Sequence, residues 1–464
     1  MSLAIMGGTI AAEYGVFRAD LLVQDGRIVS LGATGSEIPT GWERIDATGL
    51  TLMPEGVDPH CHFREPGNLE REGWRTGSMA AAAGGVTTVL EYPQAEPPVT
   101  DLKTLSQKRA LAEAESAVDF GLWGGAIEIA LPHLAEMHGG GIVGFKAFMH
   151  TRNLSFPGVD DGLILDILHA VADLRSVFAL HCENAAIQVR NIARLEEAHQ
   201  VYPLAHAESR PPIVEHEAVA RFLLLAASVP GARVHVPHVS LGTVGDLIRD
   251  ARRVGLSVSA EACPQHLLLD ESDLVEQGVW AKCGPPLRSR EDVEALWSHV
   301  LDGTIDYHAS DHAPTTTEEK EAGLENIFRA STGVINNQWA IPLIIDEALH
   351  RRGMTLDHLA RYTATNAAKR LGPYPRKGSR VGADADIALY DLSANQTIDQ
   401  ERQLNRQKWT PWHGRRLGVK VMRTIVRGRT VYDGAAITAP PGHGIYVDRE
   451  YGSRRDHSTR SALD

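Results

Sequence analysis

Residues that can bind a metal ion follow several apolar, strand-like segments of this 464-residue chain. One segment ends in Asp58-Pro59-His60-Cys61-His62, and side chains two positions apart on a strand project from the same face. Neutral imidazole nitrogens are good ligands for zinc-like cations. Four later segments carry or precede further candidate ligands, namely Lys146, His181, His238 and Asp311. A lone histidine is more often structural, but agreement between five segments favours a metal site.

Lys146 needs its own explanation because it lies in the apolar segment VGFKAFM. A buried ammonium group is costly, and as a cation it would repel a metal ion. Its unperturbed pKa is about 10.4, so its charge must change before the side chain can act as a ligand. Reaction of the neutral amine with carbon dioxide gives a carbamate, an anion with two oxygens that could bridge two metal ions. The alternatives are a salt bridge to a carboxylate and a side chain that extends its ammonium group to the surface.

The elements that position these residues alternate between strand-like and helix-like segments. Segments rich in Val, Ile, Thr and Ala predict strands over 51–59, 86–92, 118–124, 143–149, 177–182, 233–239, 257–263 and 305–310. Helical periodicity occurs between them, for example over 104–117, 162–174, 214–229, 242–255 and 291–301. This α/β alternation favours a (β/α)8 barrel, with a doubly wound open sheet as the main alternative. In a barrel, the carboxyl ends of all strands surround one mouth, where the candidate ligands would converge.

Both ends of the chain predict short strands of another kind. Near the N-terminus, Asp25-Gly26 separates two apolar runs, which is the usual signal of a two-residue hairpin. The segments 383–392 and 421–434 show similar strands with glycine-containing turns. We therefore expect the two ends to complete one small, discontinuous β module. From about residue 440 the chain is polar and turn-rich, which predicts a loosely held tail.

Composition excludes several classes of protein. Hydrophobic residues make up 43% and charged residues 23% of the chain, which are ordinary values for a globular protein. The formal net charge of −13 disfavours a nucleic-acid partner. No apolar run is long enough to span a membrane, and the first residues lack the features of a signal peptide, so we expect a soluble, cytoplasmic protein. Four scattered cysteines predict free thiols.

Taken together, these residues resemble the binuclear amidohydrolase superfamily, and within it the cyclic amidohydrolases: dihydroorotase, hydantoinase or dihydropyrimidinase, and allantoinase. The similarity extends over nearly the whole chain, through GVDPHCHFREPG (56–67), AAAAGGVTTVLEYP (80–93), GFKAFM (144–149), HCEN (181–184), SRPPIVEHEAVAR (209–221), PHVS (237–240), EACPQHLLLD (261–270), GPPLR (284–288), SDHAP (310–314) and TPWHG (410–414). The resemblance implies a barrel over 51–376 and a small β-sandwich domain built from 1–50 and 377–440, with 441–464 as the C-terminal tail. It also implies a homo-oligomer, either a dimer or a tetramer.

The resemblance further implies two divalent metal ions, usually zinc, bridged by a carboxylated Lys146. His60, His62 and Asp311 would surround the more buried ion. His181 and His238 would surround the more exposed one. A hydroxide between the ions would attack the amide bond of a small cyclic amide or ureide. Asp311 would act as general base and then return the proton to the leaving nitrogen.

The residues expected to contact the substrate do not follow one subfamily. Arg64, in HFREPG, resembles the dihydroorotases, and a guanidinium group is well shaped for a substrate carboxylate. Gln94 and Gly284 stand where dihydroorotases have asparagines, and Thr151 stands where hydantoinases have a tyrosine. His266 either touches a substrate carboxylate or carbonyl, or caps a loop. The resemblance therefore implies a cyclic amide without choosing which one.

Other polar residues near the predicted mouth have structural explanations. Arg288 is expected to anchor its loop to a carboxylate, and His312 either orients the neighbouring carboxylate or faces solvent. Cys61 should point to the opposite face of its strand from the adjacent histidines. The segments 150–162 and 313–326 are expected to overhang the mouth as lid and specificity loops.

Two other functions stay open on this evidence. One is a non-catalytic relative that binds a partner, which loss of a metal ligand would mark, although all six positions carry competent residues. The other is a different amidohydrolase reaction, such as deamination or hydrolysis of an N-acyl amino acid. The bridging lysine and the motifs HFREPG and PPLR favour ring opening over this second alternative.

Overall fold

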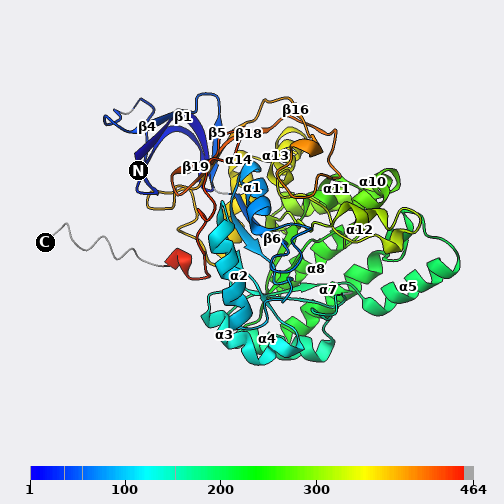
Figure 1. Ribbon diagram of the computed structural model, residues 1–464. Helices are drawn as coiled ribbons and strands as arrows, with labels where there is room; N and C mark the ends of the chain where they lie inside the picture. Colours follow the sequence, from blue (N-terminus) through cyan, green and yellow to red (C-terminus); the bar gives the residue numbers. More distant parts are fainter. Residues whose placement is uncertain (1, 36, 55, 152, 454–464) are drawn as a thin grey trace.

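The computed structural model describes residues 2–35, 37–54, 56–151 and 153–453. It has two parts, a ring of parallel strands surrounded by helices and a sheet built from both ends of the chain (Figure 1). The strands of the ring, in chain order, are β6 (Gly56–Cys61), β7 (Val86–Glu91), β8 (Asp119–Leu122), β9 (Gly124–Gly125), β10 (Phe145–Phe148), β11 (Phe178–His181), β12 (Arg233–Val236), β13 (Ser257–Ala262) and β14 (Tyr307–His308). β8 and β9 are separated by one residue and together occupy one position in the ring.

Hydrogen bonds close these strands into a barrel. β6, β7 and β8 are parallel neighbours, and β9 to β14 form a second run of neighbours. On one side, Val143 N donates to Leu122 O at 3.0 Å and joins the two runs. On the other side, His62 N donates to His312 O at 2.8 Å, which joins the end of β6 to the segment after β14. The predicted barrel is confirmed, and the open sheet is excluded.

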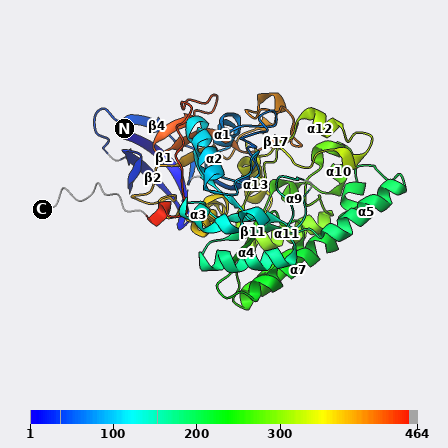
Figure 2. The ribbon, with the colours of Figure 1, turned by 60° about the horizontal axis from the view of Figure 1, so that its bottom comes forward.

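Helices surround the barrel on its outside (Figure 1, Figure 2). They are α1 (Trp74–Ala83), α2 (Leu102–Glu115), α3 (Leu134–Gly139), α4 (Asp161–Asp173), α5 (Ala185–Glu197), α6 (Ala205–Glu208), α7 (Pro212–Ala227), α8 (Gly242–Arg253), α9 (Pro264–Leu268), α10 (Glu271–Gln277), α11 (Arg290–Leu301), α12 (Thr317–Glu321), α13 (Ala340–His350), α14 (Leu356–Ala360) and α15 (Asn366–Leu371). In α4, apolar residues at helical spacing form the buried face, and Asp160 caps the first turn by accepting from Leu163 N. Among the described helices, none is long and apolar enough to cross a membrane.

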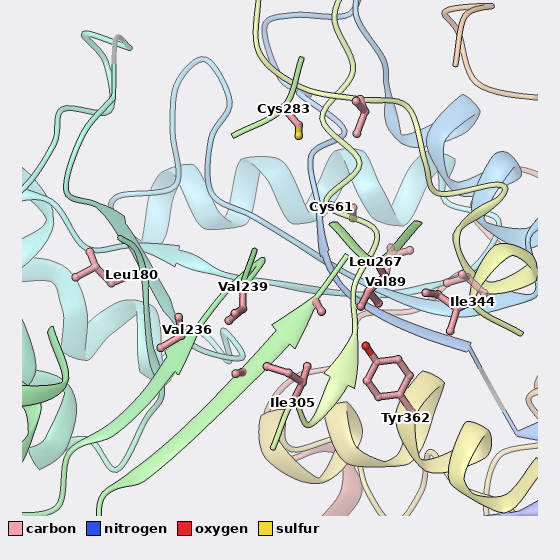
Figure 3. Close-up of a cluster of buried hydrophobic side chains, with 14 of the residues drawn as sticks. Cys61, Val89, Leu180, Val236, Val239, Leu267, Cys283, Ile305, Ile344 and Tyr362 are labelled. Atoms are coloured by element: carbon pink, nitrogen blue, oxygen red, sulfur yellow. The ribbon is translucent and has the colours of Figure 1, made fainter. Parts of the chain in front are cut away.

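A continuous apolar core lies between the strands and the helices. Figure 3 shows part of it, including Leu180 of β11, Val236 of β12 and Tyr362, which follows α14. Cys61 belongs to this core and is fully buried, in agreement with the alternation expected along its strand. All four cysteines are buried and free, which confirms the predicted thiols.

The two chain ends form one eight-stranded sheet with its own apolar core. Its strands are β1 (Ser2–Ala12), β2 (Gly15–Gln24), β3 (Arg27–Gly32), β4 (Glu43–Asp46), β5 (Thr51–Pro54), β15 (Ile387–Asp391), β18 (Lys420–Val426) and β19 (Arg429–Tyr432). Two further short strands, β16 (Gln396–Thr397) and β17 (Arg416–Leu417), pair with each other. The predicted hairpin is present between β2 and β3, where Asp25 and Gly26 both have positive φ.

One predicted strand is wrong in its extent. The segment 51–59 is not a single barrel strand, because β5 pairs with β1 and β15 in the terminal sheet and only β6 enters the barrel. The apolar pattern continues from one strand into the next, so the sequence alone did not reveal the change of sheet. The chain therefore passes directly from the terminal sheet into the barrel.

The expectation of a loosely held tail is wrong for residues 443–453. Phe120 N donates to Ile445 O at 3.0 Å and Val447 N donates to Phe120 O at 2.7 Å, so this segment lies along β8. Farther on, the Tyr451 hydroxyl donates to Asp384 Oδ2 at 2.7 Å. The prediction from polar composition was wrong because backbone hydrogen bonds, as well as apolar side chains, hold this segment in place. The rest of the predicted tail, 454–464, lies outside the described residues.

A buried ion cluster links the barrel to the terminal sheet. The Lys377 ammonium group is fully buried, lies 2.6 Å from Asp119 Oδ2 at the start of β8, and pairs with Asp386 beside β15. Asp384 Oδ2 is 3.2 Å away. Arg427 also pairs with Asp119, and Arg27 and Arg376 pair with Asp384. Removal of Lys377 would therefore leave the buried Asp386 without its cation.

We expect Lys377→Met to lower the free energy of unfolding by about 3–5 kcal/mol, because it breaks this buried cluster from one side. Urea denaturation followed by circular dichroism measures the effect. Lys103→Met, at an exposed position on α2, is the control and should change the value by no more than about 0.5 kcal/mol. Equal stabilities of the two variants would contradict the role given to the cluster.

Candidate metal centre

Three of the six candidate ligands meet beyond the carboxyl ends of β6 and β14. Nε2 of His60 lies 3.2 Å from Oδ1 of Asp311, and Nε2 of His62 lies 3.7 Å from the same oxygen. One ligand atom from each residue lies within 4.8 Å of the other two. The period of two along the strand directs both imidazoles to the mouth of the barrel. The arrangement offers two nitrogens and one carboxylate oxygen to a cation.

His181 and His238 meet in a similar way, beyond β11 and β12. Nδ1 of His181 is 2.9 Å from Nε2 of His238. The ring of His238 also lies beside that of His60, with 5.5 Å between the centroids. The two groups of donors are therefore neighbours in one site.

Lys146 lies in β10, where its side chain is fully buried. Nζ has no hydrogen-bond partner among the described residues and lies 4.8 Å from the ring centroid of Tyr92 and 4.6 Å from that of Phe148. Burial lowers the pKa of this amine to about 8. Neither alternative to the carbamate is observed in the described part of the chain, since the amine reaches neither a carboxylate nor the surface.

Two buried glutamates, which sequence reasoning missed, orient two of these histidines. Nδ1 of His60 lies 2.5 Å from Glu261 Oε1, and Nε2 of His181 lies 2.8 Å from Glu183 Oε2. A ring nitrogen that donates to a carboxylate leaves the other nitrogen with a lone pair, so each glutamate directs a free donor atom into the site. A signal was available: Glu261 interrupts the apolar strand SVSAEA, and Glu183 follows the histidine by two positions.

The charges of these partners are set by their surroundings. Burial opposes ionisation of Glu183, but the hydrogen bond from His181 and the charge of Arg210 outweigh it and lower the pKa of Glu183 to about 2. Burial lowers the pKa of His60 to about 4 and the pKa of His238 well below its usual value. The imidazoles of His60 and His238 are therefore neutral near pH 7, which is the form that binds metals.

The environment also disfavours the charge of Asp311, the one carboxylate among the candidate ligands. Burial and, after it, the charge of Glu261 raise the pKa of Asp311 well above its usual range. The backbone φ of Asp311 is +45° and that of His238 is +39°. Residues other than glycine rarely adopt this region of backbone conformation. Such strain is common where a functional side chain must be held in one position.

A pocket of about 820 Å³ opens over the candidate ligands. Three of the four expected substrate contacts line it: Arg64, Gln94 and Gly284. Arg64 has φ +65°, its Nε has no partner among the described residues, and burial lowers its pKa to about 10. The predicted overhanging loops contribute Thr151 and Thr315 to the pocket wall; residue 152 of the first loop lies outside the described residues.

The fourth expected contact, His266, is not among the described residues that line the pocket. Its Nε2 lies 2.9 Å from Pro285 O, which corresponds to the loop-capping alternative. Arg288 anchors its loop as expected, with Nη2 3.0 Å from Glu215 Oε2. His312 is fully buried with Nε2 3.3 Å from Glu72 Oε2, so it does not face solvent.

Comparison with known proteins agrees with this geometry. The family model described as "Amidohydrolase family" matches residues 51–431. This chain belongs to the amidohydrolase family. A protein named allantoinase from Rubrobacter xylanophilus is 39% identical over 97% of this chain and 99% of its own length. A second protein of that name, from Solibacter usitatus, is 35% identical over 94% of this chain and 95% of its own length.

Solved structures give the same result for the fold of this amidohydrolase. The L-hydantoinase (dihydropyrimidinase) from Arthrobacter aurescens superimposes with a TM-score of 0.94 at 31% identity, covering 96% of this chain and 99% of its own. A D-hydantoinase superimposes with a TM-score of 0.91 at 28% identity, covering 97% and 100%. The resemblance to the cyclic amidohydrolases and the expected fold class are confirmed.

The contact between Glu183 and His181 makes a prediction about metal binding. We expect Glu183→Gln to weaken binding of a divalent cation by about tenfold or more, because the neutral amide no longer fixes which ring nitrogen of His181 carries the proton. Zinc titration against a chromophoric chelator measures the affinity. Glu128→Gln, at an exposed position, is the matched control. Wild-type zinc affinity in Glu183→Gln would refute the orienting role of this glutamate.

Proposed function

We propose that this protein is a metal-dependent hydrolase that opens the ring of allantoin by cleaving one ring amide bond. The observation that carries the proposal is the meeting of five donor side chains and one unpartnered lysine beneath a single pocket. The relatives named allantoinase support the choice of substrate, since similarity to them extends over almost the whole chain.

The donor set fits a pair of divalent cations. Facing ring nitrogens, such as the two that lie 2.9 Å apart in His181 and His238, gain a shared partner when a cation binds near them. Lys146 is a buried amine without a partner, and carboxylation would turn it into an anion with two donor oxygens. We propose that the carboxylated side chain would help to hold two zinc ions. One would be held by His60, His62 and Asp311 and the other by His181 and His238.

Such cations, when bound, would polarise the substrate carbonyl and lower the pKa of an adjacent water. Asp311 would take a proton from that water as its oxygen bonds to the ring carbonyl carbon. The carbon–nitrogen bond then breaks, and Asp311 returns the proton to the leaving nitrogen, which would otherwise be a poor leaving group. The products of the cleaved bond are a neutral nitrogen group and a carboxylic acid, which then releases its remaining proton to solvent and becomes a carboxylate. Gln265 Nε2, 3.4 Å from Asp311 Oδ2, would help to keep the carboxylate in position.

Arg64 is our proposed contact to the polar edge of the ring. Arg64 lines the pocket next to the candidate histidines, and its buried Nε has no partner among the described residues. A guanidinium group can donate to a carbonyl as well as to a carboxylate. Gln94 and the backbone at Gly284 would complete the contacts. A hydantoinase is the second candidate, favoured by the TM-score of 0.94 with the L-hydantoinase. A cytoplasmic location and a dimeric or tetrameric state stay predictions.

A panel of substrates tests the proposed ring. For zinc-loaded protein, we expect kcat/KM to be highest for allantoin among allantoin, 5-substituted hydantoins, dihydrouracil and dihydroorotate. Arg64→Ala should lower this value by about tenfold or more, since hydrogen bonds from charged groups contribute about 1.5–3 kcal/mol. Arg75→Ala, on the exposed side of α1, is the control. Fastest turnover of dihydroorotate, lost in Arg64→Ala, would replace allantoin by an anionic ring.

Removal of metal and carbon dioxide tests the proposed centre. We expect a chelator to abolish activity, and zinc to restore it fully only with bicarbonate present, because the Lys146 amine must be carboxylated before it can bind metal. Native mass spectrometry should find the added mass of one CO2 on the zinc-loaded protein and none on Lys146→Met. Full recovery with zinc in CO2-free buffer would rule out the carbamate.

A further inference from the structure

A buried carboxylate connects the two groups of candidate ligands. Glu261, in β13, is fully buried, and its Oε1 lies 2.5 Å from Nδ1 of His60. The same oxygen accepts from the backbone N–H of His238 at 3.2 Å. One carboxylate therefore orients the imidazole of one ligand and the backbone of another. Any residue that fixes Glu261 acts on both groups.

His235 is bonded to the other oxygen of that carboxylate. Its Nε2 lies 3.0 Å from Glu261 Oε2, and its side chain is 1% exposed. Nδ1 of the same ring lies 3.1 Å from the hydroxyl of Tyr307, and the two rings stack with 5.3 Å between centroids. Because the phenol can donate to Nδ1, the ring can carry its proton on Nε2 and donate it to Glu261. Ser259 Oγ, 3.0 Å from Nδ1, is a second group that can hold this tautomer.

We propose that His235 is a positioning residue of the metal centre, acting through Glu261 on His60 and His238. The inference rests on the proposed function, since it requires that these ligands bind metal. His235 is not among the described residues that line the pocket, so it does not touch the substrate. Its donated hydrogen bond occupies Oε2 and leaves Oε1 directed at the two ligands. Without that donor, the buried carboxylate would have an unsatisfied oxygen and would turn or take up a proton.

Substitutions that keep or lose one nitrogen separate this role from simple packing. In His235→Gln the amide nitrogen stands near the former Nε2 and can donate to Glu261, whereas in His235→Asn it stands near the former Nδ1 and cannot. His308→Asn is the matched control. His308 is also a fully buried histidine of a barrel strand, but neither of its ring nitrogens has a partner among the described residues.

The experiment is a zinc titration of each apo-protein against a chromophoric chelator in bicarbonate buffer, followed by steady-state kinetics with allantoin. We expect His235→Asn to bind zinc about tenfold more weakly than wild type and to lower kcat without changing KM. We expect His235→Gln and His308→Asn to stay within about twofold of wild type in zinc affinity. This pattern supports the inference even if allantoin turnover is slow in every protein.

Three results would overturn the inference, and they are distinguishable from failure of the proposed function. Wild-type zinc affinity in His235→Asn would overturn it alone, because wild-type protein would still bind two ions. Equal losses in His235→Asn and His308→Asn, or in His235→Asn and His235→Gln, would assign the residue to packing. If wild-type protein binds no zinc, the proposed function fails and the inference fails with it.

Discussion

The site depends on the closure of the strand ring between β14 and β6. The carboxylate of Asp58 accepts from the backbone N–H of Ser310 at 2.9 Å and from its hydroxyl at 2.5 Å, across 252 positions of sequence. His60 lies two residues after one partner, and Asp311 lies one residue after the other. The contact that completes the barrel therefore also brings these ligands to 3.2 Å from each other. The barrel and the candidate metal site therefore depend on the same contact. If the ring of strands did not close, the donor side chains would lie apart.

Burial of the candidate site also shifts the pKa values of its ionisable side chains. In a dry environment, imidazoles stay neutral, an amine has a lowered pKa, and a lone carboxylate resists ionisation. In a protein that bound no ligand, burial of these groups would destabilise the fold, since buried charged groups are costly without partners. Here the shifts leave neutral imidazole nitrogens and an amine of lowered pKa beneath one pocket, which is the donor set that the proposed metal centre requires. Glu183 and Glu261 keep the correct ring nitrogens free, and both stay ionised because histidines beside them offset the cost of burial.

The substrate pocket does not match a single subfamily of the cyclic amidohydrolases. Arg64, in its motif HFREPG, resembles the dihydroorotases. Similarity over the whole chain is instead to proteins named allantoinase, and the solved structures that superimpose on this one include hydantoinases. Arg64 has a backbone φ of +65°, and its Nε has no hydrogen-bond partner among the described residues, so this nitrogen can donate to a substrate. That arrangement suits a ring with polar groups on one edge, whether carbonyl or carboxylate.

The sequence by itself indicated the barrel, the order of its strands and the six candidate ligands, because the period of two and the apolar runs before each polar residue are local features. It did not determine where 51–59 divides between two sheets, that 443–453 pairs with β8, or that His266 caps a loop. It also missed Glu183, Glu261 and His235. Their roles come from partners up to 201 positions away, and only closure of the barrel decides which buried polar groups meet. The local sequence pattern determines which chemistry a side chain can supply. Tertiary packing determines which atoms of other residues lie next to that side chain.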